Sequence, residues 1–239
     1  MTVDTGLRTI AVVPAFNERE ALPGVLEALA RSAPGIDVVV VDDGSTDETR
    51  SVARDHGVAC VRLPFNLGIG GALRAGYRYA YERGYDRAVQ LDADGQHRPD
   101  QIAALLDRLD AGADLVIGNR FAAGDYTIGR GRRLALFVLQ LGVRILCRRR
   151  FADTTSGFRA VGRSLLEVFA TEYPVEYMDS VETLVTTCRA GYEVAEVPVM
   201  MNQRQAGVPS TGRIRLAYHY ARLLVVLFGR SRGSIPVRR

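Results

Sequence analysis

Asp92 and Asp94 are two carboxylates whose spacing can bind a cation, and Gln96 follows two positions later. They come directly after a short apolar run of the kind that forms a buried strand. Their oxygens would lie on one side of an extended turn, which favours Mg²⁺ or Mn²⁺ with substrate phosphates and water completing the shell. An EF-hand would require glycine and glutamate where the chain has His97 and Ala103. The alternative for this segment is a polar turn that caps the next helix.

Two more polar clusters follow apolar runs in the same way. Asp42-Asp43-Gly44-Ser45 comes after residues 37–41, and Pro14-Ala15-Phe16-Asn17-Glu18 comes after residues 9–13. Acidic residues at strand ends accept hydrogen bonds from the sugar hydroxyls of nucleotides. The residues that follow Gly44 also suit a helix N-cap, and both roles can hold for neighbouring side chains.

The elements that must position these clusters alternate along the first 120 residues. Alternating strands and helices predict right-handed crossovers and an α/β, Rossmann-like doubly wound, mostly parallel sheet with helices on both faces. Ligands of such sheets bind at the carboxyl ends of the strands, where all three clusters lie. We expect strands at Thr9–Val13, Asp37–Val41, Ala59–Leu63, Ala88–Leu91 and Leu115–Ile117, and helices at about 19–31, 47–56, 69–83 and 99–110.

The second half of the chain has the opposite charge. Residues 1–120 carry 18 acids and 13 arginines, whereas residues 121–239 carry 9 acids and 18 arginines. The chain contains no lysine, which excludes Schiff-base and P-loop lysine chemistry. We expect a loop at Gly124–Arg133 and two apolar stretches among arginines, at Leu134–Leu146 and Leu223–Phe228. Both stretches are too short to span a bilayer but could lie on an anionic membrane surface; the alternative is a core helix with solvated ends.

Gly68 and Gly70 match the first two glycines of the dinucleotide fingerprint G-x-G-x-x-G. The third glycine of that motif is missing, because Leu73 stands in its place. Taken together, the motifs resemble the family two glycosyltransferases of the GT-A fold, and among them the polyprenyl-phosphate sugar synthases. The resemblance covers most of the chain in the family's order. The matching runs are 12–18, 40–47, 66–72, 91–97, 117–121, 153–159 and 196–199, followed by Arg204 with Gly207 and Ser210.

The resemblance implies a single GT-A domain over residues 1–239. Residues 1–120 would form the half that binds a nucleotide-sugar and a metal ion, and residues 121–239 the half that binds the acceptor. The residues it implies for the nucleotide-sugar are Pro14, Ala15, Phe16, Glu18, Asp42, Asp43, Gly71, Asp92, Ala93, Asp94, Arg120 and Arg204. It implies Asp92, Asp94 and Gln96 as ligands of Mg²⁺ or Mn²⁺, and a loop 124–133 that closes over the site.

The implied activity is inverting transfer of a sugar from a UDP- or GDP-sugar to a polyprenyl phosphate. Arg120 and Arg204 would contact phosphates, and Asp94 and Arg204 are expected to take part in catalysis. A hydroxyl acceptor, on a glycan or a small molecule, would require a general base, for which Glu182 is the first candidate and Asp179 the second. The alternative for these two acids is a pair on a helix surface.

A phosphate acceptor needs no base, since it is already largely dianionic at neutral pH. A third hypothesis is a non-catalytic nucleotide-binding protein, and nucleic acid is not an expected partner. With no secretory signal before the first strand, we expect a cytoplasmic protein, peripheral at the inner face of the membrane or docked on a membrane partner.

Overall fold

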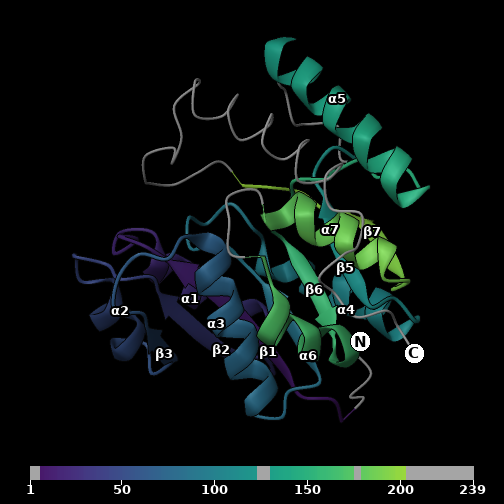
Figure 1. Cartoon of the computed structure of the whole chain (residues 1–239). Coiled ribbons are helices and arrows are strands. Elements are labelled where there is room, and N and C mark those ends of the chain that lie inside the picture. Colours follow the sequence, from purple (N-terminus) through teal and green to yellow (C-terminus); the bar gives the residue numbers. More distant parts are fainter. Residues whose placement is uncertain (1–5, 123–129, 175–178, 203–239) are drawn as a thin grey trace.

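A computed structural model describes residues 6–122, 130–174 and 179–202, without the side chains of 130–136 and 179. Its centre is a seven-stranded sheet in the order β3-β2-β1-β4-β6-β5-β7 (Figure 1). The strands are β1 (Thr9–Ala15), β2 (Asp37–Asp42), β3 (Ala59–Arg62), β4 (Arg87–Gln90), β5 (Leu115–Asn119), β6 (Arg159–Gly162) and β7 (Val194–Pro198).

The sheet is parallel except at β6. The pairs β3–β2, β2–β1, β1–β4 and β5–β7 are parallel, whereas β6 is inserted antiparallel between β4 and β5. The first residue of β6, Arg159, therefore pairs with Gln90 of β4 and with Ile117 of β5. As a result, the chain segment that enters β6 lies at the same edge as the carboxyl ends of the parallel strands.

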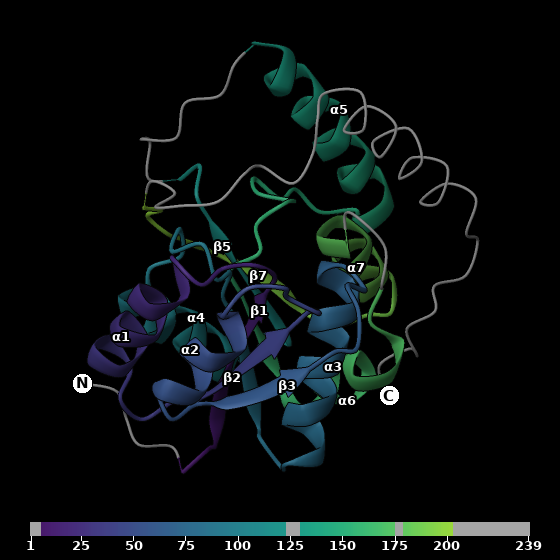
Figure 2. The same cartoon turned by 90° about the vertical axis from the view of Figure 1, so that its left-hand side faces the viewer.

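Helices cover both faces of the sheet (Figures 1 and 2). Along β1, Ile10 and Val12 belong to one buried cluster, and Ala11 and Val13 to the other, as the alternation of a strand requires. The first cluster includes side chains of α3 (Ile69–Glu82), α6 (Arg163–Glu172) and α7 (Asp179–Arg189). The second includes side chains of α1 (Leu22–Ser32), α2 (Thr49–Asp55) and α4 (Ile102–Asp110), the last preceded by a 3-10 turn at Pro99–Gln101.

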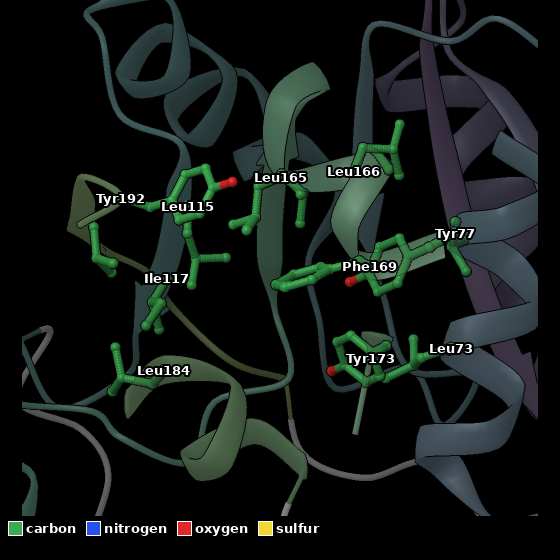
Figure 3. Packing of buried hydrophobic residues seen from close by; sticks show 14 of the residues in the cluster. Leu73, Tyr77, Leu115, Ile117, Leu165, Leu166, Phe169, Tyr173, Leu184 and Tyr192 are labelled. Carbon is green, nitrogen blue, oxygen red and sulfur yellow. The ribbon is translucent and has the colours of Figure 1, made fainter. Parts of the chain in front are cut away.

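Aromatic side chains fill the space between α3 and α6 in the first cluster (Figure 3). Tyr77 lies 5.4 Å from Phe169 and 5.2 Å from Tyr173 between ring centroids. Gly76, one residue earlier in α3, allows the helix to approach the sheet, because a Cβ atom there would overlap Cγ1 of Val12. Gly76, in the middle of α3, thus allows close packing of the helix on the sheet.

Helix α5 (Arg130–Cys147) lies on the far side of α7 from the sheet in both views (Figures 1 and 2). It begins at Arg130, so the expected loop 124–133 is wrong over its last four residues, and the rest of that loop, up to residue 129, lies outside the described residues. Arginine has a high helix propensity, so the helix that the apolar pattern predicts begins four residues closer to the N-terminus than expected. Of the described helices, none combines the length and apolar character needed to cross a membrane.

Candidate functional site

The three polar clusters meet at the carboxyl edge of the sheet. In the register of β1 and β2, Ala15 lies opposite Asp42, and the backbone N–H of Asp43 donates to the carbonyl of Ala15 at 2.9 Å. On the other side of β1, the N–H of Leu91 donates to the carbonyl of Val12 at 3.1 Å. The loops that follow β1, β2 and β4 are therefore neighbours, as the sequence predicted.

The loops after β1 and β2 are interlocked by side-chain hydrogen bonds. The N–H of Asn17 donates to Ser45 Oγ at 3.0 Å, and the N–H of Thr46 donates back to Asn17 Oδ1 at 2.9 Å. The N–H of Glu18 donates to Thr49 Oγ1 at 2.9 Å. Asn17 adopts a positive φ of 55°, a conformation that asparagine tolerates better than most residues. Phe16, beside it, remains 44% exposed at this edge.

Asp42 and Asp43 are buried, and their carboxylates accept hydrogen bonds from backbone N–H groups of nearby loop residues. Asp42 Oδ1 accepts from the N–H of Ser45 at 2.9 Å. Asp43 accepts from the N–H groups of Leu67 at 2.7 Å and Gly68 at 2.9 Å. Burial raises the pKa of the Asp43 carboxyl above its usual value, although these two hydrogen bonds act in the opposite direction. Asp43 thus fixes the segment that leads into α3, and its expected contact with a nucleotide stays a prediction.

Two glycines allow these loops to approach one another. Gly44 has a φ of 73°, and a Cβ atom there would lie 2.7 Å from the carbonyl carbon of Phe65. A Cβ atom on Gly71, which is buried at the start of α3, would lie 2.5 Å from Cβ of Leu67. Glycine is therefore required at both positions, where a side chain would collide with the segment 65–67.

The loop after β4 contains the predicted metal ligands. Asp92 has 39% of its side chain exposed, Asp94 is 8% exposed, and Ala93 between them is buried. Asp94 Oδ1 accepts from the N–H of Gln96 at 3.0 Å, so the loop turns back on itself. Within the described residues, no three or more His, Cys, Asp or Glu side chains gather into a metal cluster. Two carboxylates and an amide nevertheless fit a Mg²⁺ or Mn²⁺ ion whose remaining ligands are phosphate oxygens and water.

The buried side chain of His97 holds this loop in place. The backbone N–H of Asp92 donates to its Nδ1 at 2.9 Å, which places the ring proton on Nε2, 3.7 Å from Asp92 Oδ2. The imidazole is 4% exposed and stacks on Phe158 with 5.1 Å between ring centroids. Gly157 lies against the same carboxylate, because a Cβ atom there would be 3.1 Å from Asp92 Oδ2. The segment that enters β6 therefore forms the back of the predicted metal site.

Arg120, the residue directly after β5, is held by an ion pair that the sequence did not predict. Its Nε donates to Asp153 Oδ2 at 2.7 Å and its Nη2 donates to Asp153 Oδ1 at 3.0 Å. Asp153 is fully buried, and its own N–H donates to Glu196 of β7 at 2.8 Å. The guanidinium is therefore oriented before any ligand binds, and its expected role at a phosphate stays a prediction. Only the family-like run 153–159 drew attention to Asp153 in the sequence.

The predicted base lies on α7, at the edge of the described chain. Glu182 is 9% exposed, so it does not belong to a helix surface as the alternative hypothesis held. Asp179 is the first residue of α7, and its side chain lies outside the described residues, as does all of Arg204. The backbone two residues before Arg204 is nevertheless placed, because the N–H of Asn202 donates to the carbonyl of Gln96 at 2.9 Å. The apolar stretch 223–228 also lies outside the described residues.

A mostly parallel sheet with polar loops at its carboxyl edge defines a doubly wound α/β protein, a class whose ligands bind at that edge. Residues 10–169 match the sequence profile of Glycosyl transferase family 2, and the chain belongs to this family. Glucosyl-3-phosphoglycerate synthase from Mycobacterium tuberculosis, in a crystal structure with Mn²⁺, UDP-glucose and phosphoglyceric acid, superposes with a TM-score of 0.70. The superposition covers 94% of this chain and 80% of that one at 21% identity, and it confirms the GT-A fold.

Relatives of higher identity include two with lipid-linked names. The chain is 33% identical to polyprenol monophosphomannose synthase from Mycolicibacterium smegmatis, over 87% of this chain and 82% of that protein. It is 35% identical to undecaprenyl-phosphate mannosyltransferase from Micrococcus luteus, over 84% of this chain and 86% of that protein. The expected resemblance to polyprenyl-phosphate sugar synthases is thereby confirmed.

Proposed function

We propose that this glycosyltransferase moves a sugar from a UDP- or GDP-sugar to a polyprenyl phosphate at a membrane surface, with inversion at the anomeric carbon. The observation that carries the proposal is the alignment with the two lipid-phosphate mannosyltransferases, which spans more than four fifths of both chains in each case. A chain that aligns with these relatives over most of both lengths is expected to use the same class of acceptor.

The donor half of the site would use the three loops at the carboxyl edge. Asp92, Asp94 and Gln96 would hold Mg²⁺ or Mn²⁺, which supplies positive charge to the departing nucleoside diphosphate. Phe16 and Glu18, on the interlocked loop after β1, would line the pocket for base and ribose. Because the hydrogen bonds between the first two loops already exist, the protein would lose little conformational freedom when the nucleotide binds.

Arginines would take the phosphates. Arg120 is held edge-on by Asp153 at 2.7 and 3.0 Å, so its orientation is fixed before binding. Arg204 follows Asn202 by two residues in the sequence, and the N–H of Asn202 donates to the carbonyl of Gln96, in the loop that contains the predicted metal ligands. The planar fork of a guanidinium matches two phosphate oxygens, which suits Arg204. Arg120 already donates from Nε and Nη2 to Asp153 and Thr155, so it would contribute mainly positive charge to the phosphates.

The acceptor chemistry distinguishes the leading proposal from its alternative. A polyprenyl phosphate attacks through an oxygen that is already ionised at neutral pH, so no protein group has to remove a proton. A hydroxyl acceptor on a glycan or small molecule would need a general base, and buried Glu182 would be its first candidate. Asp179 would be the second.

Helix α5 offers a surface for the membrane that carries the lipid. Along its described part, four apolar side chains are 45% to 60% exposed, at Phe137, Val138, Leu141 and Ile145. Exposed arginines continue the surface at 144 and 148–150. Apolar side chains beside cationic ones suit the interface of an anionic bilayer, where the former enter the acyl boundary and the latter meet headgroups. Such a placement would bring the acceptor phosphate to a peripheral enzyme.

The function is tested by incubating the protein with UDP- and GDP-sugars, Mn²⁺ and one acceptor at a time. We expect a polyprenyl-phosphate sugar and a free nucleoside diphosphate in equal amounts, with transfer abolished by EDTA. Transfer to a hydroxyl but not to the lipid phosphate would refute the proposed acceptor, and nucleotide binding without release of product would favour the non-catalytic hypothesis. Glu182→Gln distinguishes a lipid-phosphate acceptor from a hydroxyl acceptor, since loss of a required base costs about 10²- to 10⁴-fold in rate.

The membrane surface is tested by sedimentation with anionic vesicles. The double variant Phe137→Ser with Ile145→Ser should bind less to vesicles that contain phosphatidylglycerol. Leu7→Ser is the matched control, because Leu7 is 44% exposed but precedes β1 at the opposite edge of the sheet. Equal binding by the α5 variant and the control variant would exclude α5 as the membrane contact.

A further inference from the structure

Arg159 is a buried cation with no role in the site described above. It is 1% exposed and is one of the largest fully buried side chains among the described residues. Removal of a charged group from water costs several kcal/mol unless hydrogen bonds compensate. A neutral side chain of similar size would avoid this cost. The hydrogen bonds of the guanidinium therefore indicate why an arginine is present at this position.

The Arg159 guanidinium connects two segments that are distant in sequence. Its Nε donates to the carbonyl of Ser156 at 2.8 Å, within the turn that enters β6. Its Nη2 donates to the carbonyl of Ser180 at 2.8 Å, in the first turn of α7. Nη1 is also buried and has no hydrogen-bond partner among the described residues. A planar fork that reaches two carbonyls at once is a geometry that lysine cannot reproduce.

Phe158 and Arg159 point to opposite faces of the sheet, as successive strand residues do. Phe158 belongs to the cluster beneath the metal-site loop, where it stacks on His97. Arg159 points the other way, toward α7. Because Gly157 also lies against Asp92, one short turn contacts both the predicted metal site and the helix that carries Glu182.

We infer that Arg159 is a positioning residue that fixes the first turn of α7, with Asp179 and Glu182, relative to the metal-site loop. This inference rests on the proposed function, in which the donor binds at that loop and the acceptor half lies on the side of α7. Without the two hydrogen bonds of Arg159, the donor loops keep their own hydrogen bonds, but the first turn of α7 is displaced. A misplacement of about 1 Å in a reacting assembly costs on the order of 10²-fold in rate.

Arg159→Lys is the primary variant and Arg159→Gln the second. For both, we expect kcat to fall by about 10²-fold, while the Kd for Mn²⁺ with nucleoside diphosphate changes by less than about 3-fold. The matched control is Arg163→Lys, because Arg163 also donates from its guanidinium to a backbone carbonyl, that of Tyr85 at 2.6 Å, but lies beyond the other end of β6. The control should retain full transfer.

Hydrogen exchange supplies a readout that does not depend on turnover. Amides in the first turn of α7 should exchange faster in Arg159→Lys than in the wild type, and those of α3 should be unchanged. Full activity of the lysine variant, or a loss of nucleotide affinity equal to the loss of rate, would overturn the inference. So would unchanged exchange in α7. If the wild-type protein transfers no sugar, the proposed function fails, whereas the exchange result still decides whether Arg159 fixes α7.

Discussion

The Arg120–Asp153 pair permits a quantitative test of how this edge of the sheet is held together. Asp153→Ala removes a fully buried carboxylate that accepts from Arg120 Nε, Nη2 and backbone N–H, at 2.7, 3.0 and 3.3 Å. Only 13% of the Arg120 side chain is exposed, so the variant leaves a nearly buried guanidinium without its counter-charge. Loss of one partner of a buried pair costs about 3–5 kcal/mol in the free energy of unfolding.

In a chain of 239 residues, this cost corresponds to a fall of about 6–20 °C in melting temperature, at 2–4 °C per kcal/mol. Calorimetry and urea denaturation of the wild type, Asp153→Ala, Arg120→Met and the double variant measure it. The double variant should be less destabilised than the sum of the single variants, because it no longer buries an unpaired charge. The exposed Arg78–Glu82 pair of α3, with an N–O distance of 2.8 Å, is the control and should show no measurable coupling. Additivity within about 0.5 kcal/mol at Arg120 and Asp153 would refute the reasoning.

Three further predictions concern the metal site, a buried phenol and the donor. Gly157→Ala should weaken Mn²⁺ binding measured by electron paramagnetic resonance, because the new Cβ atom would lie 3.1 Å from Asp92 Oδ2; Gly35→Ala, with nothing within 4 Å, should not. Burial and the hydrogen bond to Asp37 raise the pKa of Tyr85 to about 12, so the absorbance difference between the wild type and Tyr85→Phe should titrate there. Stability from this phenol should be present below its unfolded pKa of about 10 and lost as pH rises through 12. Mn²⁺ with the cognate nucleoside diphosphate at about 100 times Kd should add about 2.7 kcal/mol, or about 5–11 °C in melting temperature, and EDTA should reverse the shift.

Strands β1, β2, β4 and β5 were predictable because most of their side chains are buried and each strand is followed by a polar turn. Strand β3 is only partly buried and was predicted from its length and flanking residues. The convergence of the loops after β1, β2 and β4 followed from strand direction alone. Strand β6 was not predicted, since a four-residue segment with one arginine carries no clear apolar pattern. Its partners lie 42 to 75 residues away in sequence, so only tertiary structure defines it.

The details of the site required coordinates for a related reason. The spacing of Asp42 and Asp43 indicated a ligand site, but it could not show that Asp43 accepts two hydrogen bonds from the segment before α3. Likewise, nothing local to Arg120 predicts a partner 33 residues later in the chain. Side chains that serve ligands and side chains that hold loops are of the same types, and only their distances distinguish them.

The insertion of β6 between β4 and β5 has a consequence for how the polypeptide acquires its structure. During synthesis, β1 to β4 can pair as soon as they are made, but β5 has no neighbour until residues 159–162 have appeared. Until then, β4 presents one unpaired edge and β5 has no paired neighbour at all, and unpaired edges promote aggregation of nascent chains. A polypeptide cut after residue 120 would keep these edges open permanently. We therefore expect the acidic and basic halves, despite their contrasting charge, to fold only as one cooperative unit.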